Sequence, residues 1–109
     1  MPDAAWKRAE RAIAQRLGGR RVGPSGRNTE DVAHPWLSVE CKERRALPGW
    51  LKAAVVQARA NAPADRLAIV VLHELGTRHD GDLVVLRFGD FEEWFNGNLQ
   101  GEEETQVGA

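Results

Sequence analysis

Three charged residues in the first half of the sequence have the types and spacing of a cation-dependent hydrolytic centre. Asp31 lies in one short tract, and Glu40 and Lys42 lie in the next. Side chains alternate along a strand, so Glu40 and Lys42 share one face while Val39 and Cys41 share the other. The pattern therefore predicts an ionic face with Glu40 and Lys42 and a core face with Cys41.

The two tracts are joined by His34-Pro35-Trp36, and their alternation predicts an antiparallel pair. A tight turn about Pro35-Trp36 would set Asp31 opposite Glu40, with side-chain roots about 5 Å apart. Two like charges at that separation destabilise a hairpin unless a cation compensates them. We therefore expect Asp31 and Glu40 to bind a divalent metal.

Carboxylate ligands that leave several coordination positions open fit Mg²⁺, with Mn²⁺ as a substitute, better than they fit zinc. Lys42 follows Glu40 on the same face, about 6.6 Å along the strand. There it could orient or activate a water molecule and stabilise the charge that builds on a phosphate. Together the three residues predict a centre that hydrolyses phosphodiester bonds.

Two other interpretations stay open at this point. Pro-Trp is not a favoured two-residue hairpin turn, and a slip of one residue would turn Asp31 to the opposite face. Glu40 and Lys42 would also be unremarkable on a solvated strand face, because Glu-x-Lys is a short pattern. The neighbouring elements have to decide between these interpretations.

The first element that must position this centre is a helix over residues 3–17. Asp3 can cap its start, and Gly18-Gly19 supplies its end. Glu10 falls inside the apolar stripe of this helix, whose other members are Trp6, Ile13 and Leu17. An acidic side chain is unusual in such a stripe, unless it reaches solvent at the edge of the helix.

The remaining elements predict an α/β fold with a mixed five-stranded sheet flanked by helices. Strands are expected over residues 20–22, 30–33, 37–42, 67–72 and 82–88, with helices over 47–61 and from Asp90 onward. The apolar run 67–72 is typical of a strand buried on both faces. The helix over 47–61 should make the third and fourth strands a parallel, right-handed pair.

Length and composition bound the class of protein. The chain has 109 residues, 42% of them hydrophobic, which suits one domain over residues 1–98. Residues 99–109 are expected to be a disordered acidic tail. The lone cysteine and the absence of a signal peptide or a long apolar run predict a soluble, cytoplasmic protein with no membrane partner.

Charge is unevenly distributed along the chain. Residues 1–66 hold 13 Lys and Arg against 7 Asp and Glu, while residues 67–109 hold 2 against 9. A basic surface of this kind permits contact with a polyanion, although solvated helix surface would give the same count.

The ordered set of motifs resembles the PD-(D/E)xK nuclease superfamily. The resemblance rests on Glu10 in the first helix, Arg-Arg-Val, a Ser-Gly loop, Asp31, Val39-Glu40-Cys41-Lys42 and Gln57 in the next helix, and it covers roughly residues 5–90. The chain is most similar to small archaeal-type Holliday junction resolvases and to resolvase-like phage proteins. The resemblance implies a restriction-endonuclease-like αβββαβ core and an Mg²⁺-dependent endodeoxyribonuclease.

The resemblance also implies roles for individual residues. Asp31 and Glu40 would bind the metal with Glu10 beside them, and Lys42 would assist the attacking water. Glu30 stands where the family usually has proline, which leaves Glu30 open as the ligand in place of Asp31. Expected DNA contacts are Arg20, Arg21, Ser25, Arg27, Arg44, Arg45 and Gln57, of which the arginines would bind phosphates.

Branched DNA, such as a four-way junction met in recombination, is the expected substrate. The resemblance implies a homodimer, because cutting both strands of a symmetric junction requires two centres. An exposed apolar patch with Trp94 and Phe95 would support dimerisation. The alternative is a catalytically inactive DNA-binding or interaction module on the same scaffold.

The histidines suggest a different kind of centre. His34, His73 and His79 could join Cys41 in a zinc cluster. Their spacings match no recurrent zinc pattern, and Cys41 is expected on the face turned away from the ionic residues. The sequence therefore favours the carboxylate centre over a zinc site.

Overall fold

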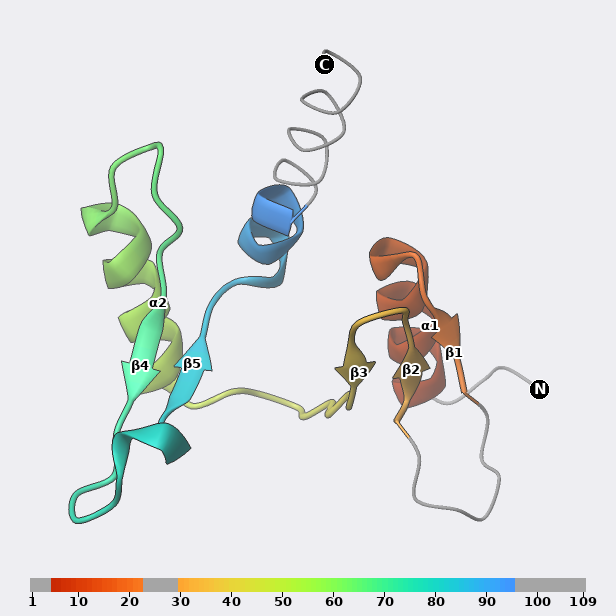
Figure 1. Cartoon of the computed structure of the whole chain (residues 1–109), viewed down its shortest axis with the longest axis horizontal. Helices are drawn as coiled ribbons and strands as arrows, with labels where there is room; N and C mark the ends of the chain where they lie inside the picture. Colours follow the sequence, from red (N-terminus) through yellow and green to blue (C-terminus); the bar gives the residue numbers. More distant parts are fainter. Residues whose placement is uncertain (1–4, 23–29, 96–109) are drawn as a thin grey trace. The chain divides into compact units, whose positions relative to one another are not determined.

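The computed structural model of the chain describes residues 5–22 and 30–95. These residues divide between Ala46 and Leu47 into two compact units (Figure 1). The elements follow the predicted order of helix, three strands, helix and two strands, and residues 88–95 form a last helix. Whether the two units make the single domain expected over residues 1–98 stays a prediction, and the expected tail lies outside the described residues.

The first unit begins with helix α1 (Ala5–Leu17), close to the predicted bounds. Gly18 ends it with a positive φ of 72°, a conformation that glycine adopts without strain. The Gly19 N–H then donates to the Ala14 carbonyl at 2.9 Å, and the Gly18 N–H donates to the Gln15 carbonyl at 3.2 Å. This pair of bonds is a Schellman motif, which satisfies carbonyls at the end of the helix. The expected cap, Asp3, lies outside the described residues.

Three short antiparallel strands follow α1. They are β1 (Arg20–Arg21), β2 (Val32–Ala33) and β3 (Ser38–Val39), in the order β1-β2-β3. Arg21 pairs with Val32 in the first ladder, and Val32 pairs with Val39 in the second. The second register is the predicted one, because a tight turn about Pro35-Trp36 requires it.

The core of the first unit lies between α1 and β2. Ala14, Leu17 and Val32 are buried, and Val32 has no exposed surface. Gly19 permits this packing, since a Cβ atom there would lie 2.5 Å from the Ala33 carbonyl oxygen. The link between α1 and β1 can lie this close to β2 only because residue 19 has no side chain.

The second unit contains a helix, an antiparallel strand pair and a further helix. Its elements are α2 (Gly49–Asn61), β4 (Val70–Leu72), the 3₁₀ turn η1 (His79–Gly81), β5 (Leu83–Val85) and the helix over residues 88–95. The carbonyl of Pro48 accepts the first bonds of α2, from the N–H groups of Leu51 and Lys52. Helix α2 packs against β4, and β4 pairs with β5.

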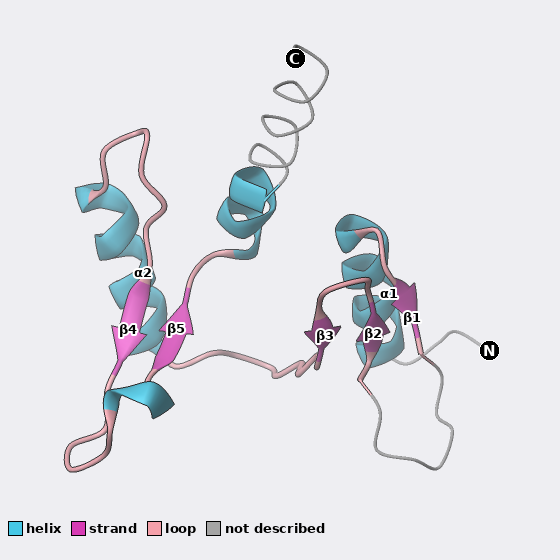
Figure 2. Cartoon of the chain, viewed as in Figure 1, coloured by secondary structure: helices cyan, strands magenta, loops and turns pink. Residues whose placement is uncertain are grey.

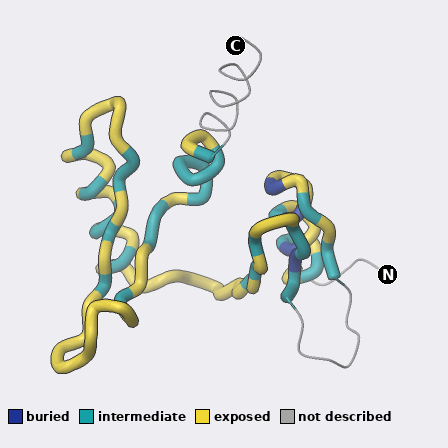
Figure 3. Tube along the Cα trace, viewed as in Figure 1, coloured by how far each residue is buried: buried dark blue, intermediate teal, exposed yellow. Residues whose placement is uncertain are grey.

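The second unit is much less buried than the first. Figure 3 shows buried segments only in the first unit, and none of the described residues from 47 to 95 is classed as buried. Val71 in β4 is 54% exposed, so the prediction of a strand buried on both faces is wrong. Val70 and Leu72 are partly covered, as expected of a strand that packs on a helix through one face.

The described residues confirm a fold of mixed helices and strands, but they do not show the predicted five-stranded mixed sheet. Figure 2 shows its strands as two antiparallel sheets, β1-β2-β3 and β4-β5. The third and fourth strands were expected to pair in parallel, and this stays a prediction because β3 and β4 belong to different units. Within each unit the neighbouring strands are consecutive in the chain, an arrangement that antiparallel geometry allows without a crossover connection.

The last helix was expected from Asp90 onward, but its start lies earlier in the chain. The helix begins at residue 88, and the Phe91 N–H donates to the carbonyl of Arg87 at 3.1 Å. Asp90 therefore lies in the first turn, where a carboxylate is still favourable. Within the described part of the chain, no helix combines the length and the apolar character needed to cross a membrane.

Candidate functional site

The hairpin of β2 and β3 brings Asp31 toward the residues that follow β3. Extending the ladder by one residue would pair Asp31 with Glu40, but the ladder departs from its register there. The Asp31 N–H donates to the Val39 carbonyl at 2.7 Å, and one Asp31 carboxylate oxygen accepts the Cys41 N–H at 2.6 Å. Asp31 therefore holds the backbone at the end of β3 in place.

The predicted centre lines one hollow of the first unit. This hollow has a volume of about 340 Å³, and its walls combine acidic and basic side chains with one indole and one thiol. Its lining residues are Trp6, Glu10, Asp31, Glu40, Cys41, Lys42, Glu43 and Arg44. Glu10, Asp31, Glu40 and Lys42 thus face a common space, although they come from α1, from the residue before β2 and from the segment after β3. Glu30, the alternative ligand, is not among the lining residues.

Glu10 is buried, with 7% of its surface exposed. Its carboxylate accepts a hydrogen bond from the Arg21 Nε at 2.8 Å, across the contact between α1 and β1. The Arg21 guanidinium also lies 5.8 Å from the centre of the Trp6 ring. A buried carboxylate requires such a partner. The expectation that Glu10 belongs to the inward face of the helix is confirmed, since Ala14 and Leu17 are buried beside it.

Glu40 and Lys42 form an exposed ion pair. Lys42 Nζ lies 3.3 Å from Glu40 Oε1, and the two side chains are 67% and 57% exposed respectively. The expected separation of faces is wrong here, because β3 ends at Val39 and residues 40–42 are not a strand. Without strand alternation, Cys41 lines the same hollow as its two neighbours rather than facing a separate core.

The pKa of the Cys41 thiol responds to the negative charges around this hollow. Burial raises the pKa of the Cys41 thiol, and the negative charges of Asp31, Glu10 and Glu40 raise it further. Each of these carboxylates disfavours a thiolate at residue 41. The three carboxylates expected to bind a metal are thus near enough to act on the same atom.

Glu10, Asp31 and Glu40 do not bring their carboxylate oxygens together as closely as the ligands of one metal ion would lie. Among the described residues, only His73, His79 and Asp82 bring three potential ligand atoms within 4.8 Å of one another. These three residues belong to the second unit, and the sequence did not predict that they would lie together. His73 and His79 were considered as zinc ligands together with His34 and Cys41, whereas Asp82 was considered only as the start of a strand.

The expected DNA contacts are distributed over both units. Arg44 lines the hollow, whereas Arg21 is engaged by Glu10. The other described candidates, Arg20, Arg45 and Gln57, are exposed, and Gln57 belongs to α2 in the second unit. Ser25 and Arg27 lie outside the described residues.

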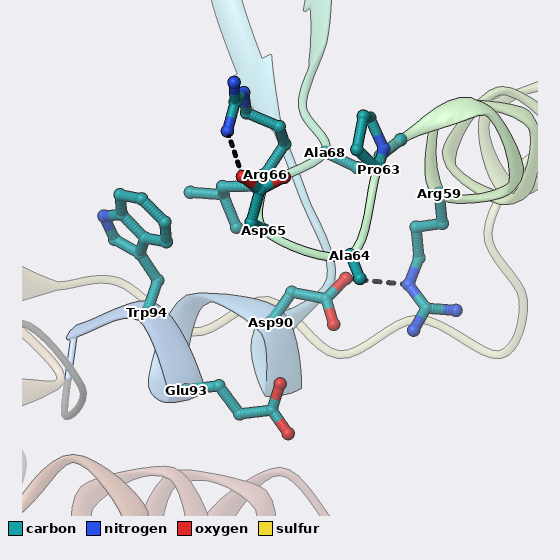
Figure 4. Close-up of a pocket in the computed structure, with 11 residues that line it drawn as sticks. Arg59, Pro63, Ala64, Asp65, Arg66, Ala68, Asp90, Glu93 and Trp94 are labelled. Carbon is teal, nitrogen blue, oxygen red and sulfur yellow. Dashed lines mark hydrogen bonds and ion pairs between the residues drawn. The ribbon is translucent and has the colours of Figure 1, made fainter.

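A second hollow lies within the second unit, between the end of α2 and the last helix. It has a volume of about 370 Å³, and Figure 4 shows Trp94 on one side of it and Arg59 on the other. Arg59 Nε donates to the Asp90 carboxylate at 2.7 Å. Arg66 is similarly engaged by Asp65 at 2.6 Å. Both arginines are therefore paired within the chain, so the hollow offers no free cation from either of them.

Comparisons of the chain with protein-family models, curated proteins and solved structures found no match.

Proposed function

We propose that this chain is an Mg²⁺-dependent endonuclease that hydrolyses DNA phosphodiester bonds. The observation that carries the proposal is the common hollow lined by Glu10, Asp31, Glu40 and Lys42. These four residues come from three separate segments of the chain and face one space. Charged residues that only interact with solvent would not be expected to line a common hollow.

The donor set fits a hard divalent cation. Asp31 and Glu40 would hold Mg²⁺, or Mn²⁺ in its place, through carboxylate oxygens, with Glu10 beside them. One Asp31 oxygen accepts the Cys41 N–H, which leaves the other for the cation. Glu40 is exposed, so its side chain can rotate toward Asp31 at little cost. Loading this site therefore requires side-chain movement but no change in the hairpin.

When bound, the cation would polarise the phosphate and lower the pKa of an attacking water. Lys42 would leave its contact with Glu40 and use its ammonium to stabilise charge on the phosphate oxygens. Arg44, on the wall of the same hollow, would hold an adjacent phosphate of the strand. Arg21 would hold the Glu10 carboxylate in its orientation rather than contact DNA.

The substrate class and the assembly are part of the same proposal. We infer that branched DNA such as a four-way junction is the substrate and that a homodimer supplies two centres. Trp94, at 49% exposure, is the apolar side chain on the last helix that a partner copy could cover. The restriction-endonuclease-like αβββαβ core belongs to this proposal too, supported by the element order α1-β1-β2-β3-α2-β4.

One observation favours a second function, a DNA-binding or interaction module without catalysis. Arg21 neutralises Glu10, and Lys42 lies beside Glu40, so the carboxylates already have cationic partners within the chain. A site satisfied in this way has less need of a metal. The two functions predict different outcomes in a single assay.

That assay incubates a labelled four-way junction and a linear duplex of the same sequence with the protein and Mg²⁺. We expect cleavage of the junction, reduced about a hundredfold or more in Asp31→Asn and in Lys42→Ala. Glu43→Gln is the matched control, because Glu43 lines the same hollow but is not a proposed ligand. A mobility shift without cleavage by the wild-type protein would establish the second function instead.

A further inference from the structure

The hairpin of β4 and β5 carries a cluster of ligands that the proposed nuclease centre does not use. We propose that His73, His79 and Asp82 bind a divalent transition-metal cation of the zinc class. One potential ligand atom from each residue lies within 4.8 Å of the other two. The proposal does not rest on the nuclease function, because its residues belong to the second unit and those of the nuclease centre to the first.

The side-chain contacts show that Asp82 lies between the two imidazoles. His73 Nδ1 is 2.6 Å from one Asp82 carboxylate oxygen, and His79 Nδ1 is 2.9 Å from the other. The two imidazole rings lie 4.3 Å apart, tilted by 31°. Two ring nitrogens and a carboxylate therefore converge without any movement of the backbone.

The strand register explains how two of these residues meet. Leu72 pairs with Leu83 in the last rung of the ladder. His73 follows the first of these residues and Asp82 precedes the second, so they occupy the next opposed positions. Opposed residues have side-chain roots about 5 Å apart. The position of His73 beside Asp82 is thus a consequence of the β4–β5 pairing.

The turn between β4 and β5 brings His79 beside Asp82 as well. Gly76, with a φ of 83°, reverses the chain after β4. The Thr77 hydroxyl and N–H both donate to the Glu74 carbonyl, at 2.8 and 3.2 Å. The Asp82 N–H then donates to the His79 carbonyl at 2.9 Å, which closes η1 against the start of β5. Local hydrogen bonds therefore fix all three ligands before any metal binds.

The chemistry of the ligands selects the cation. Imidazole nitrogen suits zinc, cobalt, nickel and copper, whereas magnesium prefers oxygen ligands. Three protein ligands leave a fourth position open for water in a tetrahedral site. The Asp82 side chain is 10% exposed, while that of His79 is 83% exposed, so a cation can enter from the His79 side. This site is thus distinct in its metal preference from the carboxylate centre.

Ion pairing alone offers another account of the cluster. A protonated histidine would also lie close to Asp82, and such a contact needs no metal. In the metal-bound state the cation replaces the direct contacts between the histidines and Asp82, so adding it changes the cluster. A metal-free ion pair predicts instead that no cation changes the cluster at any pH.

The test uses the full-length protein, stripped of metal with EDTA and dialysed. Co²⁺ is titrated at pH 7.5 and followed by visible absorption, and Zn²⁺ is then added as a competitor. We expect one equivalent of Co²⁺ to give absorption bands of a four-coordinate site, with Zn²⁺ abolishing them. His79→Ala and Asp82→Asn should each weaken binding at least about tenfold.

His34→Ala is the matched control, because His34 is a histidine of the first unit and not part of the cluster. Its affinity for Co²⁺ should equal that of the wild-type protein, and so should that of Asp31→Asn. Circular dichroism checks that each variant is folded, and the exposed side chain of His79 makes its replacement harmless to packing. The proposal is overturned if the wild-type protein gives no such bands or if His79→Ala binds Co²⁺ as tightly as wild type.

Discussion

In the first unit Glu10 is buried beside Ala14, Leu17 and Val32, whereas in the second unit His73, His79 and Asp82 lie on a hairpin with no buried residue. The first unit positions its acidic side chains by packing a helix on a sheet. The second positions its ligands by hydrogen bonds within a turn. A centre of the first kind depends on the core around it, while a centre of the second kind can itself stabilise the segment that carries it.

The largest expected effect concerns Gly19, which links α1 to β1 and lies close to β2. A methyl group at residue 19 would lie 2.5 Å from the Ala33 carbonyl oxygen and 2.9 Å from Val32 Cγ1. Gly19→Ala should therefore lower the free energy of unfolding by about 3 kcal/mol, because backbone atoms must shift. Urea denaturation followed by circular dichroism measures the change.

Gly49→Ala is its control in the second unit, since a methyl group there meets no atom within 4 Å. Gly49 is the first residue of α2, where alanine is tolerated, so this variant should lose little or no stability. Equal losses in the two variants would show that the packing of the first unit is not as tight as described.

The second prediction compares a buried valine with an exposed one. Val32 has no exposed surface, whereas Val71 is 54% exposed. Val32→Ala should cost about 2 kcal/mol of folding stability, and Val71→Ala about 0.5 kcal/mol. Thermal and urea unfolding of both variants measures the difference. A loss at Val71 as large as that at Val32 would mean that the exposed face of β4 is covered in solution.

The helices and one strand register could be predicted from the sequence. Hydrophobic spacing, Gly18-Gly19 and Pro48 were enough to locate both long helices, because such signals are local. The β2–β3 register followed from the short connection through Pro35-Trp36, and the pairing of Val32 with Val39 confirms it. Local geometry therefore determined the part of the molecule that carries the proposed centre.

Predictions that depended on distant pairing were less successful. The strand expected over residues 37–42 ends at Val39, so alternation could not place Cys41. An apolar run such as 67–72 has the same composition whether one face or two are covered, and the sequence does not specify what lies against it. The joining of strands into one sheet is a property of long-range contacts, which no local signal determines.

The candidate site shows the same division. The sequence placed Glu10 in the apolar stripe of the first helix, and the family resemblance placed it beside the metal. Neither identified Arg21 as the partner of that carboxylate. Asp82 was missed although the signal was present, since a β4–β5 register would have set it opposite His73. Combining strand pairing with ligand chemistry would have found the histidine cluster.

The third prediction compares an ion pair from each unit. The Glu10–Arg21 pair has side chains that are 9% and 18% exposed, whereas Arg59 of the Arg59–Asp90 pair is 41% exposed. Screening by water weakens the second pair. A double-mutant cycle should give a coupling of about 1.5 kcal/mol for Glu10–Arg21 and about 0.5 kcal/mol for Arg59–Asp90.

The cycle uses Glu10→Gln with Arg21→Met and Asp90→Asn with Arg59→Met, each measured alone and together by urea unfolding. Subtracting the single effects removes the cost of lost packing from each pair. A coupling near zero at Glu10–Arg21 would show that Arg21 is not needed to hold Glu10. The carboxylate would then be free to turn toward a cation without losing stability.

The smallest expected effect concerns the charge gathered around Cys41. Burial, and after it the charges of Asp31, Glu10 and Glu40, raise the pKa of the thiol. Alkylation consumes the thiolate, so a raised pKa slows the reaction at a fixed pH below that pKa. Glu40→Gln removes one of these charges from an exposed side chain and should therefore lower the pKa of the Cys41 thiol.

The measurement is the rate of iodoacetamide alkylation between pH 7 and 10 in the presence of EDTA. In Glu40→Gln the midpoint should move to lower pH, and the rate at pH 8 should rise about twofold because more thiolate is present. Glu43→Gln is the control, since Glu43 lines the same hollow but does not contribute to the raised pKa. If both variants moved the midpoint equally, the effect would reflect net charge rather than carboxylates directed at one point. A shift confined to Glu40→Gln would instead show that Glu40 shares a local potential with Asp31, which is the condition for the two residues to attract one cation.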